Sequence, residues 1–447
     1  MSKIMKIPFP LAAESLSDLP FTFCSYLTSF HQSSLGLIYL AIPWEDLVSS
    51  LGLVESELGR PSLFSPQGKL ALMFLKHYCG CSDQRLLEQL NGNIHFQLFC
   101  GICIDPAAPL LHRQLVSRIR TELAELLSIE EAQEVLAAHW RPYLSAEQTA
   151  FFDATCYESE VRYPTDVKLL YESVRWLYGL LRALRRSLSL PMVRSKYRKW
   201  MARYDLFRRQ RKPRKRRQRQ MKRGLLRLLA KLLTDAASLI STHQPLMNEK
   251  EGDRLNLLER IYEQQKIFFE TGQKPTGRII SLAKPYLRPI VRGKHNKPVE
   301  FGAKVHKIML GGISFIEKIS FDAFHEGIRL KQALFTARKL AGKIERIGAD
   351  QIYATNDNRS YCTQKNIQTD FVPKGRKGKL EEQKKVIRKA IKKERVSRLE
   401  GSFGNEKNAF HLRKVRARTQ KNEIFWIFIG MHTANALQIG KRIEKQA

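Results

Sequence analysis

The sequence predicts an α/β protein: a mixed sheet flanked by helices, preceded by an all-α region and interrupted by a basic helical insertion. Three observations support this prediction. Residues 1–145 have helical periodicity, and residues 149–155 (TAFFDAT) change to the pattern of a short buried strand. Strand patterns return only from about residue 275, after a long helical stretch, and then alternate with helices.

The N-terminal region begins helices at recognisable capping residues. In SPQGKLALMFLKHY, Ser65 is expected as the N-cap with Pro66 at the first helical position. SDQRLLEQL repeats this signal at Ser82, and NGN ends the helix. Two short helices with a tight link are typical of a helix-turn-helix-like unit, although any small helical bundle gives the same pattern.

The helical insertion, residues 166–272, is strongly basic. Between Arg194 and Arg223 there are sixteen Lys and Arg residues and one acid. This charge fits an arm that follows DNA phosphates, because like charges repel one another unless a polyanion is present; a solvated helix face or a flexible tether is the alternative. We expect the interleaved Trp200 to belong to a core, as we do Trp176 and Trp426. The predicted phosphate contacts here are Arg214, Lys215, Arg216 and Arg217.

After the insertion, the sequence predicts the rest of the sheet. Three consecutive strands are expected in RIISL, PVEFGAKVHKIML and GISFIEKISF, with LGG as the turn between the last two. KQALFTARKLAGKIERIG follows as a helix, ADQIYAT as a strand end and TDFVPKG as a short strand. A long basic helical stretch begins at GKLEEQKKVIRK, and the apolar run IFWIFIGMHTANAL is predicted to be a core helix.

Charge limits the classes of partner. The 447 residues have 77 Lys and Arg against 43 Asp and Glu, a formal net charge of +34. Such a chain is expected to bind nucleic acid through phosphates, with an anionic membrane surface as the second possibility. No signal peptide or membrane-spanning segment is predicted, so we expect an intracellular protein. Cys79, Cys81, Cys100 and Cys103 form two close pairs, which we interpret as buried thiols in preference to a zinc site.

Three carboxylates stand where elements end. Asp153 ends the first strand, Asp350 follows a later one, and Glu400 lies in the long basic helix, seven residues before Lys407. Scattered acids in a basic chain are usually ion-pair partners. Three that converge would instead hold two Mg²⁺ ions, which favour oxygen ligands and together activate a nucleophile and stabilise a leaving oxygen in phosphodiester cleavage. Asp153 would then bridge both ions.

A family resemblance supports the interpretation of these three carboxylates as metal ligands. The stretches FFDATCYESEVRYPTD, RPIVRGKHNKPVEFGAKVH, FDAFHEG, ADQIYATNDNRSYC, FVPKGRKG and RLEGSFGNEKNAFHLRKVRART resemble, in order, a bacterial insertion-sequence transposase of the DDE type. SPQGKLALMFLKHYCGCSDQRLLEQLNGNIHFQLFCGI resembles the helical N-terminal domain of that family. The resemblance implies an RNase H-like core with a mixed five-stranded sheet.

The resemblance also implies the site residues. The family's triad falls on Asp153, Asp350 and Glu400, and Lys407 matches the family's helix lysine. Many relatives follow the second aspartate with x-Gly-Tyr, where this chain has Gln-Ile-Tyr, so Asp357 is the competing second ligand. Val396 occupies the position of an arginine that some relatives carry. Further DNA contacts are therefore expected from the nearby Arg395 and Arg398, and also from Arg288, Arg292, Lys294, Lys374 and Arg376.

The predicted layout has four parts: a helical DNA-binding domain (1–145), the first part of the catalytic core (146–165), the basic insertion (166–272) and the rest of the core (273–447). The predicted function is binding of terminal inverted repeats, followed by Mg²⁺-dependent cleavage and strand transfer, with Mn²⁺ as a substitute. Double-stranded DNA is the partner, in a homodimer at synapsis, in the bacterial cytoplasm at the nucleoid. A DNA-binding protein with a degenerate core and a stand-alone DNA nuclease are the alternatives.

Overall fold

The computed structural model describes residues 4–6, 21–55, 62–144, 148–294, 297–374 and 381–446. The chain divides into two compact units. The first, called the sheet unit below, comprises Met1–Glu160, Ala303–Ser320 and Phe324–Ala447. The second, called the inserted unit, comprises Val161–Gly302 and Phe321–Ala323. The four-part layout expected from the sequence remains a prediction.

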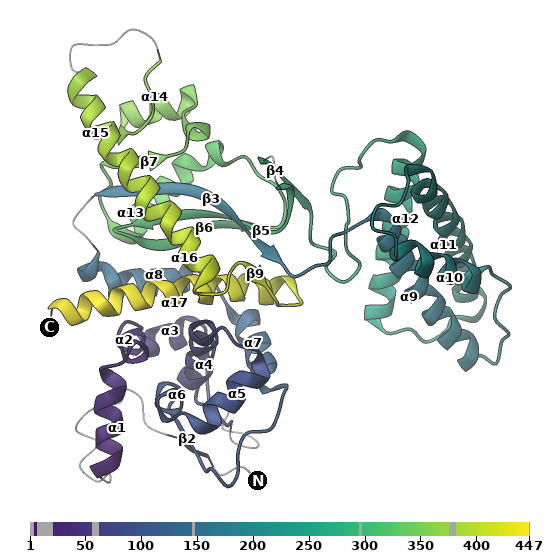
Figure 1. The fold of residues 1–447 in the computed structure, drawn as a ribbon, viewed down its shortest axis with the longest axis horizontal. Helices are drawn as coiled ribbons and strands as arrows, with labels where there is room; N and C mark the ends of the chain where they lie inside the picture. The colour runs from purple at the N-terminus through teal and green to yellow at the C-terminus, as the bar shows by residue number, and fades with distance from the viewer. Residues whose placement is uncertain are drawn as a thin grey trace. The chain divides into compact units, whose positions relative to one another are not determined.

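The N-terminal part of the sheet unit is helical, as predicted (Figure 1). Ser65 accepts a hydrogen bond from the Gly68 amide at 3.0 Å, and Ser82 accepts one from Arg85 at 3.2 Å, which confirms both predicted N-caps. A two-stranded antiparallel ribbon, β1 (Ile4–Lys6) with β2 (Ile102–Ile104), was not predicted. The helices are α1 (Phe21–His31), α2 (Ser34–Leu40), α3 (Trp44–Ser50), α4 (Pro66–Cys79), α5 (Asp83–Gly92), α6 (Ile94–Phe99), α7 (Leu115–Leu126), α8 (Ile129–Trp140) and the 3₁₀ turn η2 (Arg141–Tyr143).

A mixed sheet follows, which confirms the α/β class. Its described strand order is β4-β5-β3-β7-β8, with β6 paired to β5 and β9 paired to β3, so it has seven strands where five were expected. β3 is parallel to both β7 and β9, whereas β5 and β6 are antiparallel. The strands are β3 (Thr149–Ser159), β4 (Pro289–Lys294), β5 (Lys297–Leu310), β6 (Ile313–Ser320), β7 (Arg346–Ala349), β8 (Gln368–Thr369) and β9 (Lys414–Val415).

Two strand predictions need correction. RIISL is not a strand: Ile279 and Leu282 pack into the helical core of the inserted unit, so their apolar pattern reflects burial against helices. The strand before β5 that pairs with it is instead β4, which begins at Pro289. TDFVPKG contributes only its first residue to β8. The LGG turn is confirmed, because Gly311 and Gly312 both have positive φ (55° and 86°) between β5 and β6.

Helices complete the sheet unit. A continuous helical run covers 381–408, as α15 (Glu381–Glu394), the π-helical segment η5 (Arg395–Glu400) and α16 (Gly401–Asn408). The predicted core helix is α17 (Gln420–Gln446), which is buried over much of its length. The remaining elements are η3 (Glu326–Arg329), α13 (Leu330–Ala341), η4 (Gln351–Tyr353) and α14 (Asn356–Gln364). None of the described helices is long and apolar enough to cross a membrane.

The inserted unit is a helical bundle joined to a β-ribbon, as the helical pattern of 166–272 predicts (Figure 1). Leucines of α9 and α11 dominate its core. On α10, Tyr197 and Tyr204 stack on Tyr178 and Tyr171 of α9, with ring centroids 3.6 and 3.7 Å apart. The helices are α9 (Asp166–Ser187), α10 (Tyr197–Arg208), α11 (Lys215–His243) and α12 (Glu249–Thr271).

Candidate active site

Asp153 and Asp350 come from neighbouring parallel strands. In the register of β3 and β7, Phe151 is opposite Gly348 and Phe152 is opposite Ala349. The next step along both strands places Asp153 opposite Asp350. Side chains opposite one another in a parallel pair point to the same face of the sheet, so the register directs both carboxylates to one face.

Packing around Gly348 identifies that face. A Cβ on Gly348 would lie 2.5 Å from the Phe151 ring and 2.9 Å from Ile391 of α15, so only glycine fits. Residues two apart on a strand share a face. Asp153 and Asp350 therefore lie on the face that the 381–408 helical run covers, each two residues beyond the contact between Phe151 and Gly348.

The electrostatics of Asp153 agree with this placement. Asp153 is half-buried, and its Oδ1 accepts a hydrogen bond from the Ala154 amide at 2.7 Å. The pKa of Asp153 is raised to about 6, mainly by burial and also by the negative charges of Glu326 and Asp350; the Ala154 hydrogen bond and Arg395 oppose this rise. Asp350 is exposed at the N-terminus of η4, where its Oδ1 accepts from the Gln351 amide at 2.7 Å.

Glu400 belongs to the helical run that covers this face. Leu399, its neighbour, is fully buried in a cluster with Phe151, Met309 and Ile391. Farther along the run, Lys407 donates a hydrogen bond to Thr155 of β3 at 2.7 Å. Asp153 lies between these two contact points on β3. Glu400 itself is exposed, at the end of the π-helical segment, an irregularity that is frequent at functional sites.

The fit of a divalent metal to this site is partial. Among the described residues, no group of three or more His, Cys, Asp or Glu side chains is close enough to hold a metal ion. Two carboxylates nevertheless lie on one face, and neither forms an ion pair with a described residue. Mg²⁺ commonly takes one or two protein carboxylates and completes its shell with water and phosphate oxygens, so Asp153 and Asp350 suit it.

Two acids near Asp153 or Asp350 were not predicted from the sequence. Glu326 forms an ion pair with Lys304 at 2.7 Å, and Asn358 fixes its loop beside η4 by donating to the carbonyl oxygens of both Gly327 (2.6 Å) and Tyr353 (2.8 Å). Asp370 accepts from the Ala349 amide at 3.1 Å, at the end of β7. Glu326 lies in FDAFHEG, a stretch that carries the family resemblance, and Asp370 directly precedes another, FVPKGRKG; the resemblance was the available signal.

A buried ion pair supports the helical run from beneath. Lys307 of β5 is fully buried and donates to Glu406 at 2.7 Å and to Ser402 at 2.5 Å, and the Tyr157 hydroxyl also donates to Glu406. Burial lowers the pKa of Lys307, although the charges of Glu406 and Asp153 oppose this. The pair fixes α16 over β3 and β5.

A second buried network lies beside η4. His306 is fully buried, and its two ring nitrogens contact Glu317 (2.8 Å) and the Tyr353 hydroxyl (2.7 Å). Burial alone would raise the pKa of Glu317, but the hydrogen bonds from His306 and Arg329 hold it below its ordinary value. Tyr353, the tyrosine that the family pattern retains, therefore anchors the loop that follows Asp350.

The residues predicted to contact DNA differ in exposure, because some are exposed and others are used in contacts within the protein. Arg395 pairs with Asp370 at 3.5 Å and is mostly buried, so its charge is used inside the sheet unit. Arg288 donates to the carbonyl oxygens of Pro285 (2.6 Å) and Leu287 (3.0 Å), and Lys374 donates to Asn356 (3.0 Å). Exposed cations are Arg398, Lys374 and the series Arg214, Lys215, Arg216 and Arg217. The side chains of Arg292 and Lys294, and all of Arg376, lie outside the described residues.

The other acid and thiol candidates can also be placed. Asp357 is exposed in the first turn of α14 and pairs with Lys331 at 2.9 Å. Nothing described connects it with Asp153. The Cys79 and Cys81 thiols hydrogen-bond to each other, and burial raises the pKa of Cys100. Of the four cysteines, only Cys100 is fully buried, whereas Cys79, Cys81 and Cys103 are half-buried.

Comparisons with known families agree with the resemblance. Residues 27–122 match a family described as a transposase domain (DUF772), and residues 347–435 match a transposase DDE domain. Comparison with curated proteins and with solved structures gave no match. Both matches are to transposase families, which supports a transposase. In particular, a DUF772 domain followed by a DDE domain supports an insertion-sequence transposase of the DDE type, which confirms the resemblance found in the sequence. The DDE match spans Asp350, Glu400 and Lys407.

Proposed function

We propose that this transposase binds the terminal inverted repeats of its element and catalyses metal-dependent DNA cleavage and strand transfer with Asp153, Asp350 and Glu400. The observation that supports this most directly is the register of β3 and β7, which aligns two carboxylates on one face. The raised pKa of Asp153 adds to it, because uncompensated negative charge at a half-buried position favours a bound cation. We also propose that the sheet is an RNase H-like core.

The proposed roles of the side chains follow from their positions. Asp153 and Asp350 would hold Mg²⁺ or Mn²⁺, and Glu400 would complete the ligand set. Such ions, when bound, lower the pKa of water and stabilise charge on a phosphate. Lys407, held at Thr155 on the same face, would bind a phosphate oxygen and orient the strand to be cut. The His306–Tyr353 contact would hold the Asp350 loop in place.

The series Arg214, Lys215, Arg216 and Arg217 is proposed to contact duplex phosphates. These four exposed cations occupy the start of α11, which has no acid in its first turn. Cations at a helix N-terminus oppose the helix dipole, whereas an anion there is stabilised. A bound phosphate would relieve this repulsion. We further propose two copies of the chain in the complex that joins both element ends, and a location with the bacterial DNA in the cytoplasm.

The test is cleavage of a duplex that carries a terminal repeat, in Mg²⁺ and in Mn²⁺. Asp153→Asn preserves size and removes charge, so DNA binding should persist while cleavage falls by about 10³-fold or more. Glu158→Gln is the matched control on the opposite face of β3 and should cleave like wild type. Joining of a labelled 3′ end to a plasmid distinguishes strand transfer from simple nuclease activity. Equal cleavage by wild type and Asp153→Asn would reject the proposed catalytic role.

A further inference from the structure

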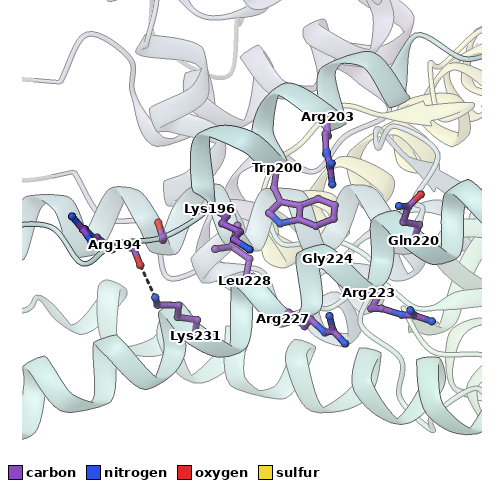
Figure 2. Close-up of a pocket in the computed structure, with 11 residues that line it drawn as sticks. Arg194, Lys196, Trp200, Arg203, Gln220, Arg223, Gly224, Arg227, Leu228 and Lys231 are labelled. Atoms are coloured by element: carbon purple, nitrogen blue, oxygen red, sulfur yellow. Dashed lines mark hydrogen bonds between the residues drawn. The ribbon is translucent and has the colours of Figure 1, made fainter.

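A pocket in the inserted unit has features that the proposed function does not explain. It has a volume of about 770 Å³ and is lined by two helical stripes. Lys196, Trp200 and Arg203 come from the start of α10, and the other wall belongs to α11 (Figure 2). The α11 residues are Gln220, Arg223, Gly224, Arg227, Leu228 and Lys231, spaced three or four apart and therefore on one face of the helix.

The charge of the pocket has one sign. Six lining side chains are cationic, and no carboxylate lines the pocket within the described chain. Nor does any of the six form an ion pair with a described acid. On another side of α11, by contrast, Lys222 is paired with Asp166, which also pairs with Arg278. Six cations gathered around one pocket without an acid repel one another, and a polyanion would relieve this repulsion.

An indole ring belongs to the pocket. Trp200 is half-buried and packs against the leucine core of the inserted unit, as the sequence predicts, and Arg203 lies 5.0 Å from its ring centroid. Its benzo edge is seated on Gly224, where a Cβ would come within 1.9 Å of the ring. Gly224 therefore admits the indole at this position (Figure 2). The ring is fixed by packing while still lining a polar, cationic pocket.

We propose that this pocket binds unpaired nucleotides of a DNA strand, with the base stacked on Trp200 and the phosphates bound by the surrounding arginines and lysines. Cationic grooves with aromatic side chains are the usual means of binding single-stranded nucleic acid. A base in a duplex is already stacked on its neighbours, and a pocket of this volume suits a ligand the size of one or a few nucleotides. The proposal rests on the proposed function, since it takes DNA to be the polyanion.

The pocket would give the transposase a preference for DNA with an unpaired segment. The phosphate-binding series at the start of α11 would bind duplex, and the pocket would receive a strand that leaves it. Six cations exceed what a single phosphate needs, so more than one phosphodiester would be bound. Binding should therefore strengthen when a free mononucleotide is replaced by an oligonucleotide.

The test measures binding by the full chain to three fluorescent DNAs: a blunt duplex, the same duplex with a ten-nucleotide thymidine tail, and the tail alone. Thymidine monophosphate serves as competitor. Wild type should prefer the tailed duplex over the blunt one. Trp200→Ala should weaken binding of the tail by about 5- to 150-fold, the effect of losing one stacked base. Arg223→Ala/Arg227→Ala should make the slope of log K against log salt concentration for tail binding shallower, by about 0.7 per lost phosphate contact.

The matched control is Arg198→Ala/Lys199→Ala, which removes two exposed charges from α10 outside the pocket. It should leave the preference for the tail unchanged. Trp200→Phe keeps an aromatic ring, so it should retain most of the preference for the tail. It replaces Trp200→Ala as the test variant if the alanine variant folds poorly.

If both pocket variants weaken binding of the blunt and the tailed duplex equally, the pocket inference is wrong and the proposed function stands. If mononucleotide competes as well as the tail, a free nucleotide is the ligand and the inference is also wrong. If wild type binds none of the DNAs, the proposed function fails as well.

Discussion

The sheet unit and the inserted unit use charged side chains in opposite ways. Near Asp153, cations form ion pairs with acids of the same unit, as in Lys307–Glu406, Arg395–Asp370 and Lys304–Glu326. In the inserted unit, six cations line one pocket without a described acid. Paired charges fix geometry, and unpaired charges remain available to an anion. The contrast therefore separates a region that positions carboxylates from one that holds the polyanion.

The largest effect on cleavage should come from substituting the carboxylates near Asp153 that form no ion pair with a described residue. Asp350→Asn removes the partner of Asp153 in the β3–β7 register, so cleavage should fall by about 10³-fold or more with DNA binding retained. Asp357→Asn is the matched control, because it changes an exposed acid already paired with Lys331. Rates of cleavage of a terminal-repeat duplex measure both. If Asp357→Asn loses cleavage and Asp350→Asn cleaves normally, then Asp357 is the second carboxylate of the site and Asp350 is not.

The second effect tests whether the paired charges of the sheet unit are structural. Lys307→Ala leaves Glu406 and Tyr157 buried without a cation, and should lower the free energy of unfolding by about 3–5 kcal/mol. Lys331→Ala, at an exposed pair, should cost at most about 1 kcal/mol. Chemical denaturation followed by circular dichroism measures both variants. Equal losses would mean that the buried pair adds nothing beyond a surface pair.

These two regions differ in how far the sequence predicts them. Local signals sufficed for the N-caps at Ser65 and Ser82, for the LGG turn and for the helical insertion, because each depends on neighbours in the chain. RIISL failed because period and composition do not distinguish a paired strand from an extended segment buried against helices. The type of an element depends on nearby residues in the chain, whereas the segment that packs on it and buries it can be far away in the sequence.

The site shows the same limit. Strand ends and acids predicted Asp153 and Asp350 individually, but their alignment depends on the β3–β7 register, which no local pattern specifies. Glu326 and Asp370 were missed because each is one acid in a loop, and only its approach to Asp153 or β7 makes it notable. The expectation that Trp200 packs on a core is confirmed, but its place in the pocket depends on Gly224 of the next helix. These relations join residues that are distant in the sequence.

The smallest predicted effect concerns histidines, and it again separates the two units. In the sheet unit, burial lowers the pKa of both His77 and His432 to about 3. Each folded-state pKa lies below the ordinary value of 6.5, so the unfolded chain takes up the proton first as pH falls. The stability is complete above pH 6.5 and decreases toward pH 3, by about 1.4 kcal/mol per pH unit for each histidine. The inserted unit's His243 is exposed, so acid should unfold the sheet unit first.

His432→Phe tests this difference. Its ring packs against Phe428, with centroids 4.4 Å apart, and Nε2 is buried without a hydrogen-bond partner, so phenylalanine keeps the packing and loses only the Asn435 contact at Nδ1. Between pH 7 and pH 5, the variant should lose about 2 kcal/mol less stability than wild type. Denaturation curves at the two pH values, followed by near-ultraviolet circular dichroism, give the comparison. Identical pH dependence in both proteins would show that His432 is not buried neutral, and that the order of acid unfolding must have another cause.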